Sequence, residues 1–276
     1  MTNPLMHGKR GLVMGVANDH SIAWGIARRL AEHGAGIAFT HQGESLGKRV
    51  RPLAASIGSD LVLPCDVEDL ASVDAVFNTL GERWGSIDFL VHAIAFSAKD
   101  ELKGRYADTS RENFARTMLV SCFAFTEAAK RAAALMPGGG AMLTLTYGGS
   151  SRVMPNYNVM GLAKAGLEAS VRYLASDLGP AAVRVNAISA GPVRTLAGAG
   201  IADARLMFNY QKRHAPLRRT VSIEEVGGAA LYLLSDLSSG VTGEIHYVDS
   251  GYSTISMPHP EALKAVDAAE SAAESA

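Results

Sequence analysis

Short runs of apolar residues alternate along the chain with longer stretches in which apolar residues recur every three or four positions. The short runs lack the apolar–polar alternation of a half-exposed strand, so they predict strands that are buried on both faces. The longer stretches have the spacing of amphipathic helices. The predicted strands cover residues 11–16, 36–40, 61–65, 89–94, 141–147, 183–189 and 244–248, and the predicted helices include residues 22–33, 70–84, 114–135 and 161–178.

This alternation predicts an α/β protein with a Rossmann-type, doubly wound, seven-stranded parallel sheet. Buried strands with helices between them pair in parallel, and right-handed crossovers place the helices on both faces of the sheet. No internal repeat or linker interrupts residues 1–256, which we interpret as a single domain. Residues 257–276 are rich in Ala and Glu and have little to bury, so we predict a frayed or disordered tail.

One connection stands out between the sixth and seventh predicted strands, because residues 195–220 carry apolar side chains in two short amphipathic stretches. A long segment over a binding site is typical of a lid. Its apolar side favours an acyl chain, although another small apolar substrate or a contact between subunits is an alternative. The candidate substrate contacts on this lid are Ile201, Met207 and Phe208.

Composition excludes several classes of function. Apolar residues make up 48% of the chain, which excludes a disordered protein, and 26 basic against 27 acidic residues without a long basic stripe argue against nucleic acid. Cys65 and Cys122 form no CxxC pair and the histidines lack metal-ligand spacing, so no metal is expected. No apolar run approaches the ~20 residues of a membrane helix, and the N-terminus does not resemble a signal peptide. We therefore expect a cytoplasmic protein without a membrane partner.

The loop after the first predicted strand has features of a dinucleotide-binding turn. In a Rossmann-type sheet, its backbone N–H groups and the dipole of the following helix face the cofactor's pyrophosphate. Gly15 permits the tight turn, Ser21 can cap the helix and offer a hydroxyl to phosphate, and Gly25 allows close packing of helix on sheet. The strict G-x-G-x-x-G is absent, so an ordinary capped turn is the alternative.

The residues after the second and third predicted strands bear on the choice between NADH and NADPH. Gln42 can hydrogen-bond a ribose hydroxyl, and the nearest firm cations, Lys48 and Arg49, lie well into the next helix. A 2′-phosphate would find no close cation, which predicts a preference for NADH. Asp66 ends the third strand, where it either forms a turn or borders the adenine.

Tyr157 and Lys164 are the candidate catalytic pair. On one helix they would lie two turns apart on the same face, with Cα atoms about 10.5 Å apart. A nucleotide ribose could fill that gap, with Lys164 binding its hydroxyls and favouring a more acidic phenol. The phenol could then donate a proton to a carbonyl oxygen that gains charge during hydride transfer. Taken singly, a loop-anchoring tyrosine and a surface lysine are the alternatives.

Several stretches carry a family resemblance: GVA at 15–17 with SIA at 21–23, FTHQ at 39–42, NYNVMGLAK at 156–164 and RVNAISAGPVRTLA at 184–197. From about residue 8 to 256 the chain resembles the short-chain dehydrogenase/reductase superfamily. That superfamily usually has Tyr four positions and Ser seventeen positions before the lysine, where this chain has Met160 and Tyr147. The departure is the pattern of a divergent branch, the bacterial NADH-dependent enoyl-acyl-carrier-protein reductases, which the chain closely resembles.

The resemblance implies roles for individual residues. Tyr157 would stabilise an enolate, Lys164 would hold the nicotinamide ribose, Tyr147 would be a second active-site phenol, and Ser97 would lie near the substrate. The residues implied to line the NADH site are Gly15, Ser21, Ile22, Gln42, Asp66, Val67, Ile94, Val193, Arg194, Thr195, Leu196 and Ala197, together with Lys164.

The resemblance also implies a homotetramer and an acyl carrier protein as the partner that brings the substrate. Because the carrier protein is acidic, a basic docking face is expected, and the family places several cations on the first lid helix. Arg205 is present there, but Ala202 and Leu206 are neutral. Other cations of the lid could compensate or could simply be solvated, namely Lys212, Arg213, Arg218 and Arg219.

The predicted reaction is reduction of the trans-2 double bond of an enoyl thioester, in the last step of the fatty-acid elongation cycle. A short-chain carbonyl or alcohol reductase is the first alternative, and the missing tyrosine four positions before Lys164 argues against it. A catalytically silent NAD-sensing protein is the second, and the presence of both Tyr157 and Lys164 argues against that.

Overall fold

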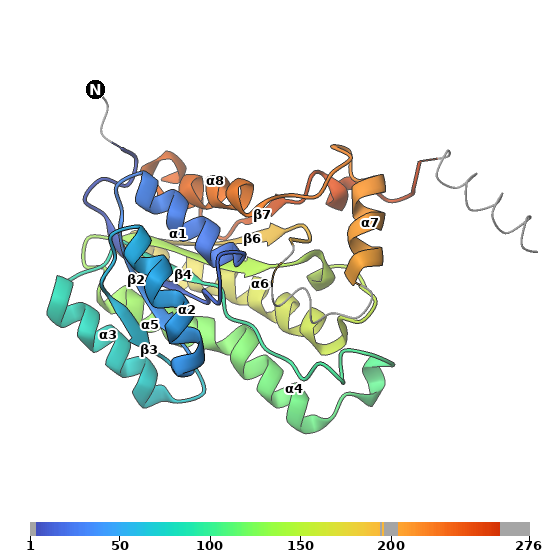
Figure 1. Ribbon diagram of the computed structural model, residues 1–276, viewed down its shortest axis with the longest axis horizontal. Helices are drawn as coiled ribbons and strands as arrows, with labels where there is room; N and C mark the ends of the chain where they lie inside the picture. The colour runs from blue at the N-terminus through green and yellow to red at the C-terminus, as the bar shows by residue number, and fades with distance from the viewer. Residues whose placement is uncertain (1–3, 194, 196–203, 260–276) are drawn as a thin grey trace, which may run out of the picture.

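The structure, a computed structural model, describes residues 4–193, 195 and 204–259. Within these residues seven strands form one parallel sheet in the order β3-β2-β1-β4-β5-β6-β7 (Figure 1). The predicted Rossmann-type sheet is confirmed. The strands are β1 (Arg10–Met14), β2 (Gly36–His41), β3 (Val62–Pro64), β4 (Phe89–His92), β5 (Gly140–Thr146), β6 (Val183–Ala190) and β7 (Ile245–Val248).

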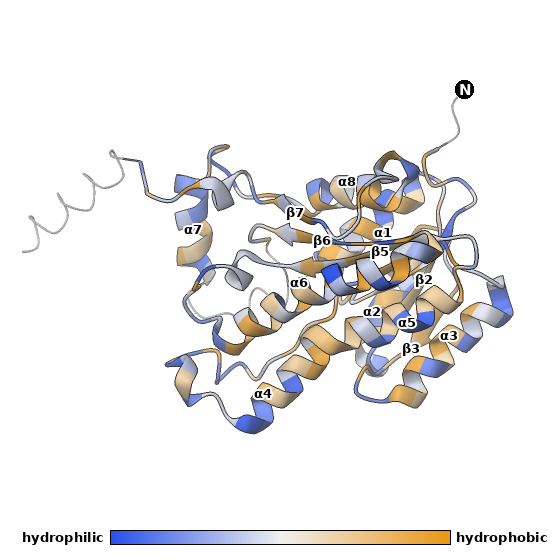
Figure 2. Cartoon of the chain, turned by 180° about the vertical axis from the view of Figure 1, so that it is seen from behind, coloured by the Kyte–Doolittle hydropathy of each residue, from blue (hydrophilic) through white to orange (hydrophobic). Residues whose placement is uncertain are grey.

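Helices cover both faces of the sheet, as the pattern predicts. One apolar core lies between the sheet and α1, α2 and α8, and a second lies between the opposite face and α3, α5 and α6. Figure 2 shows apolar residues concentrated on the strands and on helix sides that pack against them. The helices are α1 (Ile22–Glu32), α2 (Gly43–Ser56), α3 (Leu70–Trp84), α4 (Arg111–Met118), α5 (Ala124–Ala134), α6 (Asn158–Leu178), α7 (Ala204–His214) and α8 (Ile223–Leu234).

The predicted helix over residues 114–135 is interrupted near its middle. A π-helical turn, Leu119–Phe123, joins α4 to α5 without a break in the chain direction. Such turns change which side chains face the neighbouring elements and often occur near functional sites. Here the turn places the buried Ser121 against the segment that leaves β4.

β1 and β4 end two residues earlier than predicted, because the segments that follow them leave the sheet where they pass each other. Gly15 follows β1 with a φ of +100°, a conformation that disfavours side chains. A Cβ on Gly15 would lie 2.2 Å from the carbonyl oxygen of Ala93, which follows β4. The expected strand residues beyond this point therefore belong to loops at the carboxyl edge of the sheet.

Gly25 packs against another helix, so the expectation that it serves contact between helix and sheet is wrong. A Cβ on Gly25 would lie 2.6 Å from the carbonyl oxygen of Ile223 in α8, and a Cβ on Gly227 would lie 2.7 Å from the carbonyl oxygen of Gly25. The two glycines let α1 and α8 approach closely on the same face of the sheet.

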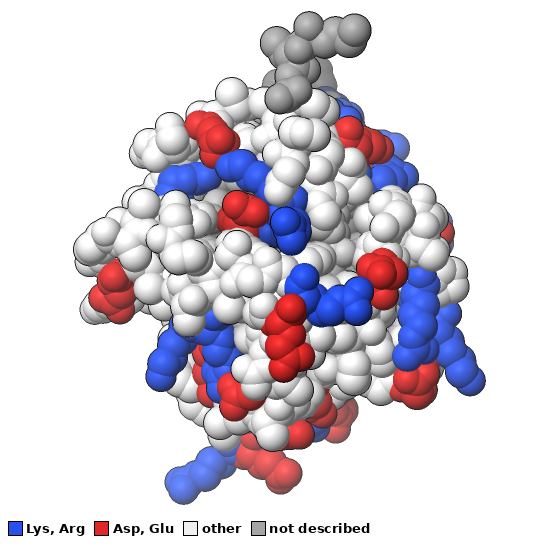
Figure 3. Space-filling model, turned by 90° about the vertical axis from the view of Figure 1, so that its left-hand side faces the viewer, with Lys and Arg blue, Asp and Glu red and all other residues white. Residues whose placement is uncertain are grey.

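The surface shows no segregation of charge on the face drawn in Figure 3, where acidic and basic side chains are interspersed. Among the described residues, no helix combines the length and apolar character needed to cross a membrane.

Replacement of Gly25 by Ala is expected to lower the free energy of unfolding by about 1–3 kcal/mol, because the added methyl group overlaps the α8 backbone. Gly228→Ala is the matched control, since Gly228 lies in α8 with nothing within 4 Å of its Cβ position. The control should keep or raise stability, by up to about 1 kcal/mol. Urea unfolding of both variants measures the difference, and equal stability would contradict the close contact.

Candidate active site

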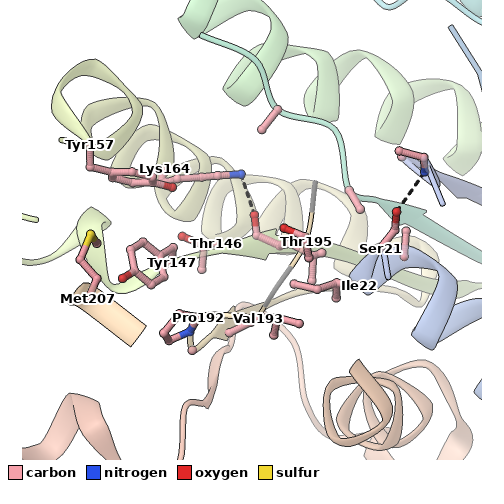
Figure 4. Close-up of a pocket in the computed structure, with 18 of the residues that line it drawn as sticks. Ser21, Ile22, Thr146, Tyr147, Tyr157, Lys164, Pro192, Val193, Thr195 and Met207 are labelled. Carbon is pink, nitrogen blue, oxygen red and sulfur yellow. Dashed lines mark hydrogen bonds between the residues drawn. The ribbon is translucent and has the colours of Figure 1, made fainter. Parts of the chain in front are cut away.

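A cavity of about 260 Å³ opens at the carboxyl edge of the sheet, where the strand order reverses between β1 and β4 (Figure 4). Ligands of doubly wound sheets bind at this switch point. The cavity is lined from the loops after β1, β4, β5 and β6 and from helices α1, α6 and α7. Of the predicted site residues, the structure brings together here Gly15, Ser21, Ile22, Tyr147, Tyr157, Lys164, Val193, Thr195, Met207 and Phe208.

Other residues that line the cavity were not predicted, because they carry no reactive group. They are small or apolar side chains at strand ends and one hydroxyl, and only their place after a strand could have suggested them. They include Ala93, Ala95, Leu145, Thr146, Gly191 and Pro192.

Tyr157 and Lys164 both reach the cavity and both are buried, with 8% and 7% of their surface exposed. Lys164 lies within α6, and its Nζ donates a hydrogen bond to the carbonyl oxygen of Leu145 at 2.8 Å. Tyr147 packs edge-on against Tyr157, with ring centroids 5.3 Å apart and planes at 71°. The predicted pair therefore lies together, with a second phenol beside it.

The backbone around Tyr157 explains how the tyrosine enters the cavity. Tyr157 immediately precedes α6, and its neighbours Asn156 and Asn158 have φ angles of +57° and +36°. Asparagine tolerates this left-handed region better than most residues. The Asn158 side chain also donates to the carbonyl oxygen of Glu101 at 3.2 Å. The Asn–Tyr–Asn turn thus fixes where α6 begins and where the phenol points.

Ser21 occupies the residue before α1, but its side chain does not cap that helix. Its hydroxyl oxygen instead accepts hydrogen bonds from the backbone N–H groups of Ala17 and Asn18, at 3.0 and 3.1 Å. The expected side-chain cap is therefore wrong, because the preceding loop folds back onto the hydroxyl. Ser21 holds the loop in shape and still lines the cavity.

The comparisons with known proteins agree with this geometry. Residues 15–253 match the family model described as enoyl-(acyl carrier protein) reductase. The chain belongs to this family. It is 72% identical over 266 residues to the enoyl-[acyl-carrier-protein] reductase [NADH] 2 of Rhizobium meliloti, covering 96% of this chain and 99% of the relative.

Solved structures of family members are also similar. FabI from Candidatus Liberibacter asiaticus is 62% identical, with a TM-score of 0.91 over 94% of this chain and 100% of that one. The reductase from Anaplasma phagocytophilum, solved in complex with NAD, is 56% identical, with a TM-score of 0.90 over 94% and 98%. The family predicted from the motifs is confirmed, and with it an NADH-dependent enoyl reductase.

Burial sets the protonation of the site in this reductase. It raises the pKa of Tyr157 far above its ordinary value and raises the pKa of Tyr147 to about 12. It lowers the pKa of Lys164 to about 8, against smaller opposing effects of Cys122 and Glu168. The expected acidification of the phenol by Lys164 is therefore wrong for this arrangement, because desolvation of the phenolate dominates. Tyr157 is a neutral hydrogen-bond donor.

Gln42 and Asp66 lie together at the ends of β2 and β3, although neither lines the cavity. The Gln42 amide donates to the Asp66 carboxylate at 3.1 Å, and the backbone N–H of Glu68 donates to the same carboxylate at 3.0 Å. Arg51 contacts the end of β2, where one of its terminal nitrogens lies 3.5 Å from Nε2 of His41. The expectation that no cation lies close to this position, with Lys48 and Arg49 as the nearest, is therefore wrong, because α2 turns Arg51 toward the strand end.

Val67 and Ile94 are absent from the cavity lining and pack instead into or against the core beneath α3 and α5.

Ser97 is also absent from the cavity lining. It is buried in a polar cluster in which Thr117 donates to its hydroxyl at 3.0 Å and Asn113 at 3.2 Å. In the same segment, the Ser121 hydroxyl accepts from the N–H of Phe96 and donates to its carbonyl, at 2.9 and 2.8 Å. These contacts anchor the wall that continues from Ala95.

Four predicted site residues lie outside the described part of the chain, namely Arg194, Leu196, Ala197 and Ile201. The tail predicted from residue 257 lies outside it from residue 260 onward. Within the described ranges, no group of three His, Cys, Asp or Glu side chains is placed to hold a metal ion.

The lowered pKa of Lys164 predicts a pH dependence of cofactor use. Because the folded-state pKa is about 8, the ammonium charge is present below pH 8 and is lost as the pH rises above it. The kcat/KM for NADH, which reports the free enzyme, should therefore fall above an apparent pKa near 8. Lys164→Arg keeps its charge at every accessible pH and should flatten this limb. An unchanged wild-type kcat/KM between pH 7 and 9.5 would contradict the assignment.

Proposed function

We propose that this chain reduces the trans-2 double bond of enoyl thioesters carried by acyl carrier protein, in the last step of fatty-acid elongation. In this reaction NADH would supply a hydride to C3 and leave as NAD⁺, the electron pair of the double bond would move to give an enolate, and a proton from solvent would add to C2. The observation that carries the proposal is that Tyr157 and Lys164 converge in one cavity with the Gly15–Ser21 loop.

Tyr157 is assigned the stabilisation of the enolate. Its hydroxyl is protonated, because burial raises its pKa, and can donate a hydrogen bond to the thioester oxygen as negative charge develops there. The low-dielectric surroundings of the buried phenol strengthen that bond. Tyr147, edge-on beside it, restricts the ring of Tyr157 and adds an aromatic wall.

Lys164 is assigned the binding of the ribose hydroxyls next to the nicotinamide. An ammonium has three N–H groups, and the bond to Leu145 uses one of them. The remaining donors can bind two ribose oxygens between the lysine and the phenol. Thr195, after β6, lines the same cavity as this pair. Gln42 and Asp66, at the ends of β2 and β3, are assigned the adenosine end of the cofactor.

The acyl chain is assigned to the side of the cavity that Met207 and Phe208 of α7 line. The carbonyl-reductase alternative finds no support in the geometry around α6. Met160, at the position where that class has its tyrosine, is buried in a cluster with Leu102, Tyr157 and Ala163. An apolar side chain there leaves Tyr157, immediately before α6, as a phenol that lines the cavity together with Lys164.

We further propose that the chain acts as a single domain over residues 1–256, in the cytoplasm, as a homotetramer. An apolar stripe on α6 supports oligomerisation, because Leu162, Ala169 and Tyr173 share one face at helical spacing and Tyr173 is 75% exposed. Phe123, on the neighbouring π turn, is 52% exposed. Cys65 and Cys122 are unpaired and buried, which suits a reducing compartment.

NADH oxidation with crotonyl thioester tests the reaction. Tyr157→Phe should lower kcat by about 10²–10³-fold, the effect of removing one donor to a developing oxyanion. Tyr106→Phe is the matched control, because Tyr106 is exposed and lies outside the cavity lining. Faster turnover of simple ketones than of crotonyl thioester would favour a carbonyl reductase instead.

Sedimentation tests the oligomer. Tyr173→Glu places a charge in the α6 stripe and should shift the protein from a tetramer to smaller species. Leu70→Glu is the control, since Leu70 is also exposed but begins α3 at the far edge of the sheet. A monomeric wild-type protein, or a tetramer that tolerates Tyr173→Glu, would contradict the proposed interface.

A further inference from the structure

Arg51 and Glu44 form an ion pair beside the carboxyl end of β2. Both terminal nitrogens of the Arg51 guanidinium donate to the Glu44 carboxylate, at 3.0 and 2.8 Å. One of these nitrogens also lies 3.5 Å from Nε2 of His41, the last residue of β2. The other ring nitrogen of His41 donates to the carbonyl oxygen of Gly43 at 2.9 Å, which leaves Nε2 as the acceptor for Arg51.

The fit of these groups against α2 depends on Gly47. A Cβ at this position would lie 2.8 Å from Cε1 of His41 and 3.1 Å from Nη1 of Arg51. Glu44, Gly47 and Arg51 share one face of α2, at intervals of three and four residues. The helix therefore presents a carboxylate and a guanidinium side by side toward the end of β2, across a position that has no side chain.

The end of β2 is where a Rossmann-type enzyme distinguishes its cofactors. An acidic or neutral group there binds the ribose 2′-hydroxyl of NADH, and an arginine nearby accommodates the 2′-phosphate of NADPH. Gln42, bonded to Asp66, is at the hydroxyl-reading position. Arg51 is a cation next to that position, yet its fork is occupied by Glu44.

We propose that Glu44 is a cofactor-specificity residue, which excludes NADPH by occupying Arg51, and that Arg51 is a latent receptor for a 2′-phosphate. This inference rests on the proposed function and names a determinant of its choice between NADH and NADPH. Carboxylate and phosphate offer a guanidinium the same two-oxygen contact, so Glu44 competes directly with the phosphate. The Glu44 carboxylate also repels that dianion.

The pair is suited to such a role because it is exposed and ionised. The side chains of Arg51 and Glu44 are 47% and 68% exposed. The guanidinium can therefore release the carboxylate oxygens and bind phosphate oxygens without any change in the core. Arg51 lowers the pKa of Glu44, which keeps the carboxylate charged at neutral pH. An exposed pair contributes little to stability, so its removal leaves the fold intact.

The test is the ratio of kcat/KM with NADPH to kcat/KM with NADH, in enoyl thioester reduction by the full-length protein. Glu44→Gln should raise this ratio by about tenfold at low salt, mainly through the KM for NADPH, because a like charge is removed and a cation becomes available. The gain should shrink as salt is added, since exposed charges are screened. Asp60→Asn is the matched control. Asp60 is an exposed acid paired with Arg83, and it lies before the start of β3, at the end of the strand opposite to its carboxyl end.

A double variant identifies the receptor. Arg51→Met in the Glu44→Gln background should remove the gain with NADPH. Direct binding gives a second readout without turnover: 2′,5′-ADP should bind Glu44→Gln more tightly than wild type, whereas 5′-ADP should change much less. An unchanged cofactor ratio in Glu44→Gln, or a gain that persists without Arg51, overturns the proposal. Absence of NADH-dependent enoyl reduction in the wild-type protein would instead count against the proposed function.

Discussion

The shape of the site depends on the close approach of the two segments that follow β1 and β4. Gly15 crosses Ala93 at a separation that leaves no room for a side chain, with a backbone conformation that only glycine adopts without strain. Immediately beyond this crossing, one segment reaches Ser21 and the other reaches Ala95, and both line the cavity. A larger residue at the crossing would separate the two strands at the switch point and displace the two walls together.

Desolvation is the second constraint, and it acts on both Tyr157 and Lys164. The same burial that shields a hydride from water keeps Tyr157 protonated and brings the pKa of Lys164 to about 8. Nζ of the lysine donates to a backbone carbonyl, and within the described residues no carboxylate forms an ion pair with it that would restore its usual pKa. An ammonium poised in this way can respond to the charge of a bound cofactor.

The two ends of the cofactor are assigned to different positions along the carboxyl edge of the sheet. The nicotinamide end is assigned to the Tyr157–Lys164 cavity, and the adenosine end to the ends of β2 and β3, where Gln42 and Asp66 are bonded. Between them the β4 segment is held from behind by Ser121 of the π turn. The turn links an irregularity in one helix to the placement of one wall of the cavity.

The sequence by itself determined the strand–helix alternation, the parallel sheet, the family and the Tyr157–Lys164 pair. These follow from local patterns: buried runs, helical periodicity, and motifs whose residues are neighbours in the chain. Only the tertiary structure decided that Ser21 holds its own loop rather than capping α1, that Gly25 faces α8, that Tyr157 is not acidified, and that Ser97 is buried with Thr117. Each of these outcomes depends on groups distant in the chain or on burial. Spacing along a sequence does not specify which carbonyl lies beside a glycine, or how much water reaches a phenol.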